Sequence, residues 1–164
     1  EITQITTPYF EGYELDVMGK VGNYDYIENK ILTYWKGMLD LGATTVWEEY
    51  DPKLSGIEHY RMYGNKYGKS LCHAWGAAPI YLLGKYYLGV EPTSDGYETF
   101  EVKPHLGRFG YIKGTVPIKD GKVRVYLSKD KISVTATKPG GTLIWDGMAY
   151  KLEVNKEISI SKEK

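Results

Sequence analysis

The chain has 164 residues, of which 42% are hydrophobic, 14% aromatic and 26% charged, and its 21 basic residues balance 21 acidic ones. This apolar content at zero net charge excludes a disordered chain, and the missing basic excess argues against nucleic acid or an anionic membrane as partner. No apolar run of about 18 residues predicts a membrane-spanning helix, and we expect no signal peptide at the start. The single Cys72 excludes an internal disulfide.

Residues 1–90 carry the pattern of helices. Thr7-Pro8 predicts an N-cap followed by proline at the first helical position. An apolar stripe at helical spacing then leads to Gly22, formed by Phe10, Tyr13, Val17, Met18 and Val21. A second helix is predicted over 24–41, and a third over 70–88, where Pro79 should introduce a kink or mark a break. The long loop between them, 43–69, is of a length that is typically functional or disordered.

Residues 91–164 carry the pattern of short strands. Period-two alternation marks seven segments, over 99–103, 111–118, 122–127, 131–137, 142–145, 149–154 and 157–160. Asp-Gly pairs at 120–121 and 146–147 predict tight hairpins. A cluster of Pro, Thr, Ser, Asp and Gly over 91–97 marks the boundary with the helical part. The pattern predicts an α+β fold in two parts, residues 1–90 helical and residues 91–164 an antiparallel β-sandwich.

The two parts also differ in charge and in aromatic content. Residues 1–90 hold 11 acidic against 8 basic residues and 12 of the 16 tyrosines, whereas residues 91–164 hold 10 acidic and 13 basic residues. The helical part either packs on the sandwich as one α+β domain or is the end of a larger helical domain. Periodicity alone leaves both interpretations open.

The densest polar cluster follows the second predicted helix. Glu48, Glu49 and Asp51 place three carboxylates within four positions, flanked by Trp47 and Tyr50. Aromatic rings stack on the apolar face of a sugar, and a carboxylate can act as acid, base or hydroxyl acceptor. The pattern indicates either a carbohydrate site or a solvated acidic loop.

His73 is the second candidate. On the predicted third helix it lies one turn from the N-terminus, where the helix dipole disfavours the imidazolium form. A neutral His73 could bind a substrate hydroxyl, or it could be a core histidine with satisfied hydrogen bonds. Cys72 is interpreted as a small buried hydrophobic residue. The three histidines, at 59, 73 and 105, lack metal-ligand spacing, so neither a metal nor a cofactor is expected.

These segments resemble the bacterial α-L-rhamnosidases of glycoside hydrolase family 78. The specific motifs are Gly-Ala-Thr-Thr-Val-Trp-Glu at 42–48 and Ser-x-x-His at 70–73. Further matching segments lie at 8–10, 34–41, 81–84, 88–90, 96–97, 103–105 and 114–117. The resemblance therefore covers essentially the whole chain. It implies the last part of a six-hairpin (α/α) barrel over residues 1–90, an incomplete toroid, followed by the C-terminal β-sandwich.

The resemblance also implies roles for three residues. Glu48 falls on the general base, His73 on a residue that contacts the sugar, and Trp47 on a wall of the sugar pocket. Many members have Asn before the histidine, whereas this chain has Cys72, which removes one expected hydrogen bond. Glu49 and Asp51 are supporting candidates around the site.

The family hydrolyses terminal α-L-rhamnose with inversion, so the implied substrate is a rhamnose-containing glycoside or polysaccharide. Inversion needs a second carboxyl group as acid, which in this family lies upstream in the barrel, so we expect the chain to be inactive alone and to pack on the N-terminal part of its own enzyme. A polysaccharide-degrading role favours the periplasm or the exterior. Two alternatives stay open: a non-catalytic carbohydrate-binding or structural β-sandwich, using Trp145 and Tyr111 if it binds glycans, and another six-hairpin glycosidase.

Overall fold

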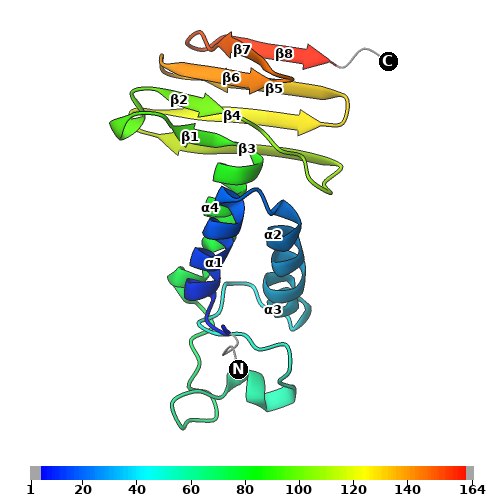
Figure 1. The fold of residues 1–164 in the computed structure, drawn as a ribbon. Helices are drawn as coiled ribbons and strands as arrows, with labels where there is room; N and C mark the ends of the chain where they lie inside the picture. Colours follow the sequence, from blue (N-terminus) through cyan, green and yellow to red (C-terminus); the bar gives the residue numbers. More distant parts are fainter. Residues whose placement is uncertain (1–4, 162–164) are drawn as a thin grey trace. The chain divides into compact units, whose positions relative to one another are not determined.

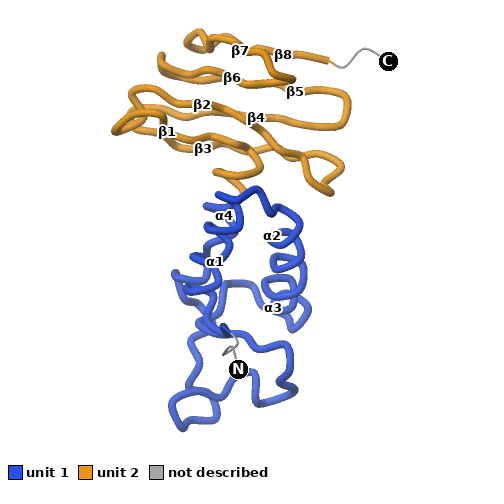
Figure 2. The backbone as a smooth tube through the Cα atoms, in the orientation of Figure 1, with its two compact units in different colours: residues 1–82 blue, residues 83–164 orange. Residues whose placement is uncertain are grey.

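The computed structural model describes residues 5–161, and the chain divides into two compact units between Leu82 and Leu83 (Figure 2). Unit 1 is built from helices and a long loop, and unit 2 from two β-sheets (Figure 1). The two-part α+β fold expected from the sequence is therefore confirmed. Among the described residues, none of the helices combines the length and the apolar character needed to cross a membrane.

Unit 1 begins with an antiparallel pair of helices. Helix α1 spans Pro8–Lys20, with Thr7 as its extended N-cap and proline at the first turn, as predicted. The second helix runs without a break through α2 (Tyr24–Lys30), a π-helical turn η1 (Ile31–Trp35) and α3 (Lys36–Asp40). The Asn23 side chain accepts a hydrogen bond from the Tyr26 N–H and caps α2. The predicted helix over 24–41 is thus present, with one π-helical turn in its middle.

The buried face of α1 differs from the predicted apolar stripe. Phe10, Tyr13 and Val17 are more than half exposed, whereas Glu11 and Leu15 are fully buried. The cause is close packing: α1 contacts both α2 and α4, and a Cβ added at Gly12 would lie 2.9 Å from the Cβ of Ala78. Small residues therefore face the neighbouring helix, and Glu11 is held by Lys30 of α2 at 2.8 Å.

The third predicted helix begins later than its apolar pattern indicates. Residues 70–77 are irregular apart from one 3₁₀ turn, η3 (Ala74–Gly76), and the helix consists of α4 (Ala78–Leu82) followed by the π-helical turn η4 (Leu83–Tyr87). Backbone groups of the irregular stretch bind partners elsewhere, because the Gly76 carbonyl accepts from the Trp35 indole and the His73 N–H donates to Val46. Pro79 lies in the first turn of α4, so it marks a break in the predicted helix, which is the second of the two outcomes expected for it.

Unit 2 is a sandwich of two four-stranded sheets, with all seven predicted strands present (Figure 1). One sheet has the order β1-β2-β6-β7, formed by Val90–Pro92, Phe100–Val102, Gly141–Trp145 and Met148–Lys151. The other has the order β3-β4-β5-β8, formed by Tyr111–Ile118, Gly121–Ser128, Lys131–Ala136 and Glu157–Ser161. The short strand β1 was not predicted, and the β2–β6 pair is parallel, while the other pairs are antiparallel.

Alternation along the strands builds the core of unit 2. Val123, Val125 and Leu127 of β4 point inward and are at most 2% exposed, as are Val134 and Phe100. Asp146-Gly147 links β6 to β7 with φ of 49° and 75°, which is the left-handed geometry that a two-residue type I′ hairpin requires. The hairpin predicted from this Asp-Gly pair is confirmed.

Candidate active site

Two segments of unit 1 that lie far apart in sequence run side by side at the site. The Glu48 N–H donates to the Ser70 carbonyl at 2.9 Å, and the His73 N–H donates to the Val46 carbonyl at 2.9 Å. The Thr45 hydroxyl also donates to the Leu71 carbonyl. This main-chain pairing, called here the site ladder, joins residues 45–48 to residues 70–73. It brings the two motifs of the predicted site, the Glu48 and His73 segments, into one place.

Glu48 is a buried carboxylate with dedicated hydrogen-bond donors. Glu48 is only 5% exposed, so this residue is not part of a solvated acidic loop. Oε1 accepts from the Tyr63 hydroxyl at 2.5 Å, and Oε2 accepts from the Ser70 N–H at 3.0 Å. These two donors hold the pKa of Glu48 below its ordinary value. The carboxylate is therefore ionised near neutral pH and can accept a proton.

An imidazole and an indole lie beside this carboxylate. His73 Nδ1 is 3.9 Å from Glu48 Oε2, and the His73 ring centroid lies 4.1 Å from that of Trp75. The Trp75 indole N–H donates to the Glu48 carbonyl at 3.1 Å. His73 is in extended conformation ahead of η3, so the predicted influence of a helix dipole on it is wrong, and its position results from the site ladder instead.

Tyr63 reaches Glu48 through an unusual backbone. Met62 and Asn65 form an antiparallel bridge, and the two residues between them, Tyr63 and Gly64, have φ of 52° and 75°. A tyrosine in the left-handed region is uncommon, since its Cβ is crowded there. Tyr63 as a residue is 76% exposed, yet its hydroxyl donates to a carboxylate oxygen of the buried Glu48. This turn therefore aims one hydroxyl at the candidate base.

The neighbouring acidic residues point elsewhere. Glu49 accepts from the Thr6 hydroxyl at 2.9 Å and lies 3.3 Å from the Lys69 ammonium, whose side chain is fully buried. Asp51 accepts from the Lys53 N–H at 2.9 Å and stabilises a local turn. The hydrogen-bond donors of Glu49 and Asp51 differ from those of Glu48. Glu49 and Asp51 therefore stabilise the loop, and they do not form with Glu48 the carboxylate cluster that their spacing suggested.

Aromatic packing holds the loop between the two sides of the site ladder in place. Tyr50 is buried, stacks on His59 at 5.7 Å between ring centroids, and meets Tyr34 of η1 edge to face at 5.4 Å. A Cβ at Gly37 would lie 2.3 Å from the Tyr50 hydroxyl oxygen. Because only glycine leaves this space, Tyr50 can lie directly on α3 and fix the chain next to Glu49.

The predicted pocket tryptophan is less accessible than a second one. Trp47 is 3% exposed and lies 5.8 Å from the Tyr60 ring, whereas Trp75 is 39% exposed. Trp75 also lines a hollow of about 410 Å³, together with Tyr9, Tyr13 and Tyr81. Trp75 falls within the helix predicted over 70–88, and neither this hollow nor the contact of Tyr63 with Glu48 was predicted.

One further sequence interpretation, that of Cys72, can be compared with the structure. Cys72 is exposed, so its interpretation as a buried hydrophobic residue is wrong, because the segment is an irregular loop rather than a helix. His59 is buried against Tyr50. Within residues 5–161, no three His, Cys, Asp or Glu side chains are arranged to hold a metal ion.

Unit 1 thus combines antiparallel helices with a buried, ionised carboxylate that contacts Tyr63 and Trp75, a combination compatible with a carbohydrate site. The family model described as the bacterial alpha-L-rhamnosidase 6 hairpin glycosidase domain matches residues 5–87, just over half of the chain. The chain therefore belongs to this family.

Solved structures agree with this assignment. The GH78 family rhamnosidase of Bacillus sp. GL1 is 28% identical over 88% of the chain, with a TM-score of 0.69. The alpha-L-rhamnosidase from Dictyoglumus thermophilum is 24% identical over 80% of the chain, with a TM-score of 0.57, and shows the same fold. The chain spans 16% and 15% of the lengths of these two proteins. No curated protein sequence matches the chain.

Proposed function

We propose that this chain is the C-terminal part of an inverting α-L-rhamnosidase that removes terminal rhamnose from glycosides or polysaccharides. Residues 1–90 would complete its six-hairpin barrel, and residues 91–164 would form its C-terminal β-sandwich. The observation that carries the proposal is Glu48, a buried and ionised carboxylate with two dedicated donors in the family's domain. Each carboxylate oxygen keeps a further lone pair, so Glu48 can still accept a proton from a water molecule.

The reaction assigns Glu48 one of two carboxyl roles. In an inverting glycosidase, a base deprotonates the attacking water while an acid protonates the leaving oxygen, and the two groups lie about 6.5–9.5 Å apart. Glu49 and Asp51 are occupied by Thr6, Lys69 and the turn at Lys53. The acid would therefore come from the remainder of the barrel, outside this chain.

The groups around Glu48 have separate roles in this proposal. His73 contacts a sugar hydroxyl next to the base. The exposed indole of Trp75 faces the sugar ring, where stacking on the apolar C–H face stabilises binding. Trp47, predicted as a pocket wall, is buried and would support that wall from behind.

The proposal is tested with the full-length protein that contains this chain. We expect hydrolysis of an aryl α-L-rhamnoside, and proton NMR of the first product should show the β-anomer, which reports inversion. Faster hydrolysis of another aryl glycoside would favour the second candidate, a six-hairpin glycosidase with a different sugar. No hydrolysis of any of them would favour a binding or structural role.

The 164-residue chain alone should give no turnover of the same aryl rhamnoside. The reason is that, in our proposal, the general acid and most of the barrel lie outside the 164-residue chain. The measurement compares it with the full-length protein at equal concentration, with a circular dichroism spectrum to show that the chain is folded. Hydrolysis by the pure chain at a rate near that of the full-length protein would contradict the missing-acid argument.

Tyr63→Phe should move the acidic limb of the pH profile of kcat/KM to higher pH in the full-length enzyme. The phenolic O–H stabilises the ionised Glu48, so its removal raises the pKa of the base. A base acts only when unprotonated, and we expect a loss of about tenfold at the acidic end with little change above the limb. Tyr67→Phe is the matched control, since Tyr67 is an exposed tyrosine of the same loop. An unchanged limb in Tyr63→Phe would refute this role.

A further inference from the structure

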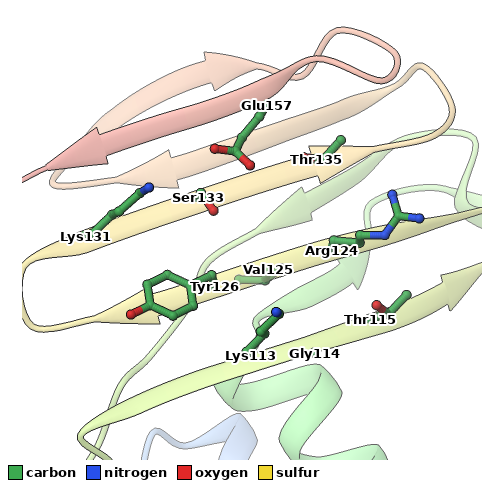
Figure 3. A pocket seen from close by; sticks show the side chains of 10 residues that line it. All are labelled: Lys113, Gly114, Thr115, Arg124, Val125, Tyr126, Lys131, Ser133, Thr135 and Glu157. Atoms are coloured by element: carbon green, nitrogen blue, oxygen red, sulfur yellow. The ribbon is translucent and has the colours of Figure 1, made fainter.

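The outer face of the sheet β3-β4-β5-β8 is a regular polar surface. Strand register places Lys113 opposite Tyr126 and Thr115 opposite Arg124. On the next strand pair, Tyr126 faces Ser133 and Arg124 faces Thr135, which in turn faces Glu157. Figure 3 shows these side chains across one surface of the sheet. They line a shallow cavity of about 650 Å³, called here the sheet groove.

The sheet groove carries more positive than negative charge. Lys113, Arg124 and Lys131 line it, against the single carboxylate of Glu157. All four side chains are exposed, and in the part of the chain that the structure describes none of the three cations has an ion-pair partner. Folded surfaces usually intersperse the two signs. The excess of three cations over one carboxylate on one surface therefore favours an anionic ligand.

Aromatic rings and hydroxyls accompany these cations. Tyr111 and Tyr126 stack with ring centroids 6.3 Å apart and an interplanar angle of 23°. Tyr111 is 65% exposed, so the pair presents nearly parallel rings at one end of the groove. Thr115, Ser133 and Thr135 add hydroxyls between the charges. Trp145, by contrast, packs against the core of unit 2.

We propose that the sheet groove binds an anionic polysaccharide built from carboxylated sugars. The lysines and the arginine would pair with sugar carboxylates, Arg124 in the bidentate geometry that guanidinium favours. The tyrosine pair would stack on the apolar face of a sugar ring, and the hydroxyls would bind sugar hydroxyls. This site lies in unit 2 and does not depend on Glu48 or on the proposed reaction.

The same surface is less suited to nucleic acid. Duplex DNA presents one phosphate charge per about 1.7 Å of helix axis, and proteins that bind it typically contact many phosphates. The sheet groove offers only three cations, and the carboxylate of Glu157 lies in the same groove. Lys113, Arg124 and Lys131 lie on three neighbouring strands. The strand register offsets Arg124 from Lys113 by two positions and from Lys131 by four, at about 3.3–3.4 Å per position. The charges are therefore spread widely, as carboxylates on separate sugar rings would be.

The test uses the whole 164-residue chain and polygalacturonate, with its fully methyl-esterified form as the uncharged probe. We expect binding of polygalacturonate by isothermal titration calorimetry, weakened by added salt, and no detectable binding of the ester. The double variant Lys113→Ala/Arg124→Ala should lower the affinity by about tenfold or more. The matched control Lys119→Ala/Lys151→Ala removes the same charge from other surfaces of unit 2 and should change the affinity by less than about twofold.

A second variant separates stacking from charge. Tyr126→Ala should weaken binding of polygalacturonate by about fivefold to tenfold, and Tyr126→Phe should restore it, because stacking needs only the ring. Equal losses in the two double variants would overturn the proposal, because they would indicate a response to net charge alone. Equal affinity for duplex DNA, or for the methyl ester, would overturn it as well.

Discussion

Glu48→Gln in the full-length enzyme should lower kcat for an aryl α-L-rhamnoside by about 10²–10⁴-fold, the usual contribution of general acid–base catalysis. The amide has nearly the same shape as the carboxylate but cannot take a proton from water. KM should change little, since His73 and Trp75 would still hold the sugar. The measurement is steady-state kinetics at several substrate concentrations.

Two controls keep the interpretation of Glu48→Gln clear. Glu58→Gln makes the same chemical change in the same loop, at a side chain that is 46% exposed and paired with Arg61, so activity should remain near normal. Thermal unfolding of Glu48→Gln should stay close to that of the parent protein. A properly folded Glu48→Gln enzyme with near-normal kcat would show that another group is the base.

Glu49→Gln should destabilise the site segment by about 3 kcal/mol, the range found when one partner of a buried ion pair is removed. Lys69 is the reason: its side chain is fully buried, and Glu49 lies 3.3 Å from its ammonium group. Without that carboxylate the charge of Lys69 remains in the interior and has lost its ion-pair partner. Urea unfolding of the 164-residue chain, followed by tryptophan fluorescence, measures the change.

The reverse change gives the matched comparison for this pair. Lys69→Met removes the buried charge and keeps an unbranched side chain of similar length. The remaining Glu49 is 25% exposed and keeps its hydrogen bond from Thr6, so it stays partly hydrated. We therefore expect a smaller loss than for Glu49→Gln. If Lys69→Met were the more destabilising of the two, the burial argument would be wrong.

Regular elements with strong local signals could be predicted from the sequence. Thr7-Pro8 indicates the start of α1, and the strict alternation Val123, Val125, Leu127 indicates β4, because both depend on neighbours within a few residues. The exposed stripe of α1 shows where such a pattern becomes insufficient. Periodicity reports an apolar face, but close packing through Gly12 decided which face meets α4.

The site was predictable in part. The motifs that carry Glu48 and His73 indicated both residues, and the structure brings them within 3.9 Å. The extended conformation at His73 depends on one hydrogen bond to the Val46 carbonyl, a contact across 27 positions that no local pattern contains. Tyr63 was hidden for another reason: the first position of such a turn usually carries Asn, Asp or Gly, so a tyrosine there gives no turn signal.

The site ladder has a consequence for engineering. Because residues 45–48 and 70–73 are joined to each other directly, the chain leaves and returns at nearly the same place, and the intervening residues form an Ω-like excursion. The buried part of this excursion is fixed by the stacked rings of Tyr50 and His59, whereas its tip over 61–67 is largely exposed. The tip can thus be exchanged or lengthened at a small cost in closure entropy. Libraries confined to these positions, with Tyr63 kept as the donor to Glu48, would vary what surrounds the carboxylate while both of its hydrogen-bond donors stay in place.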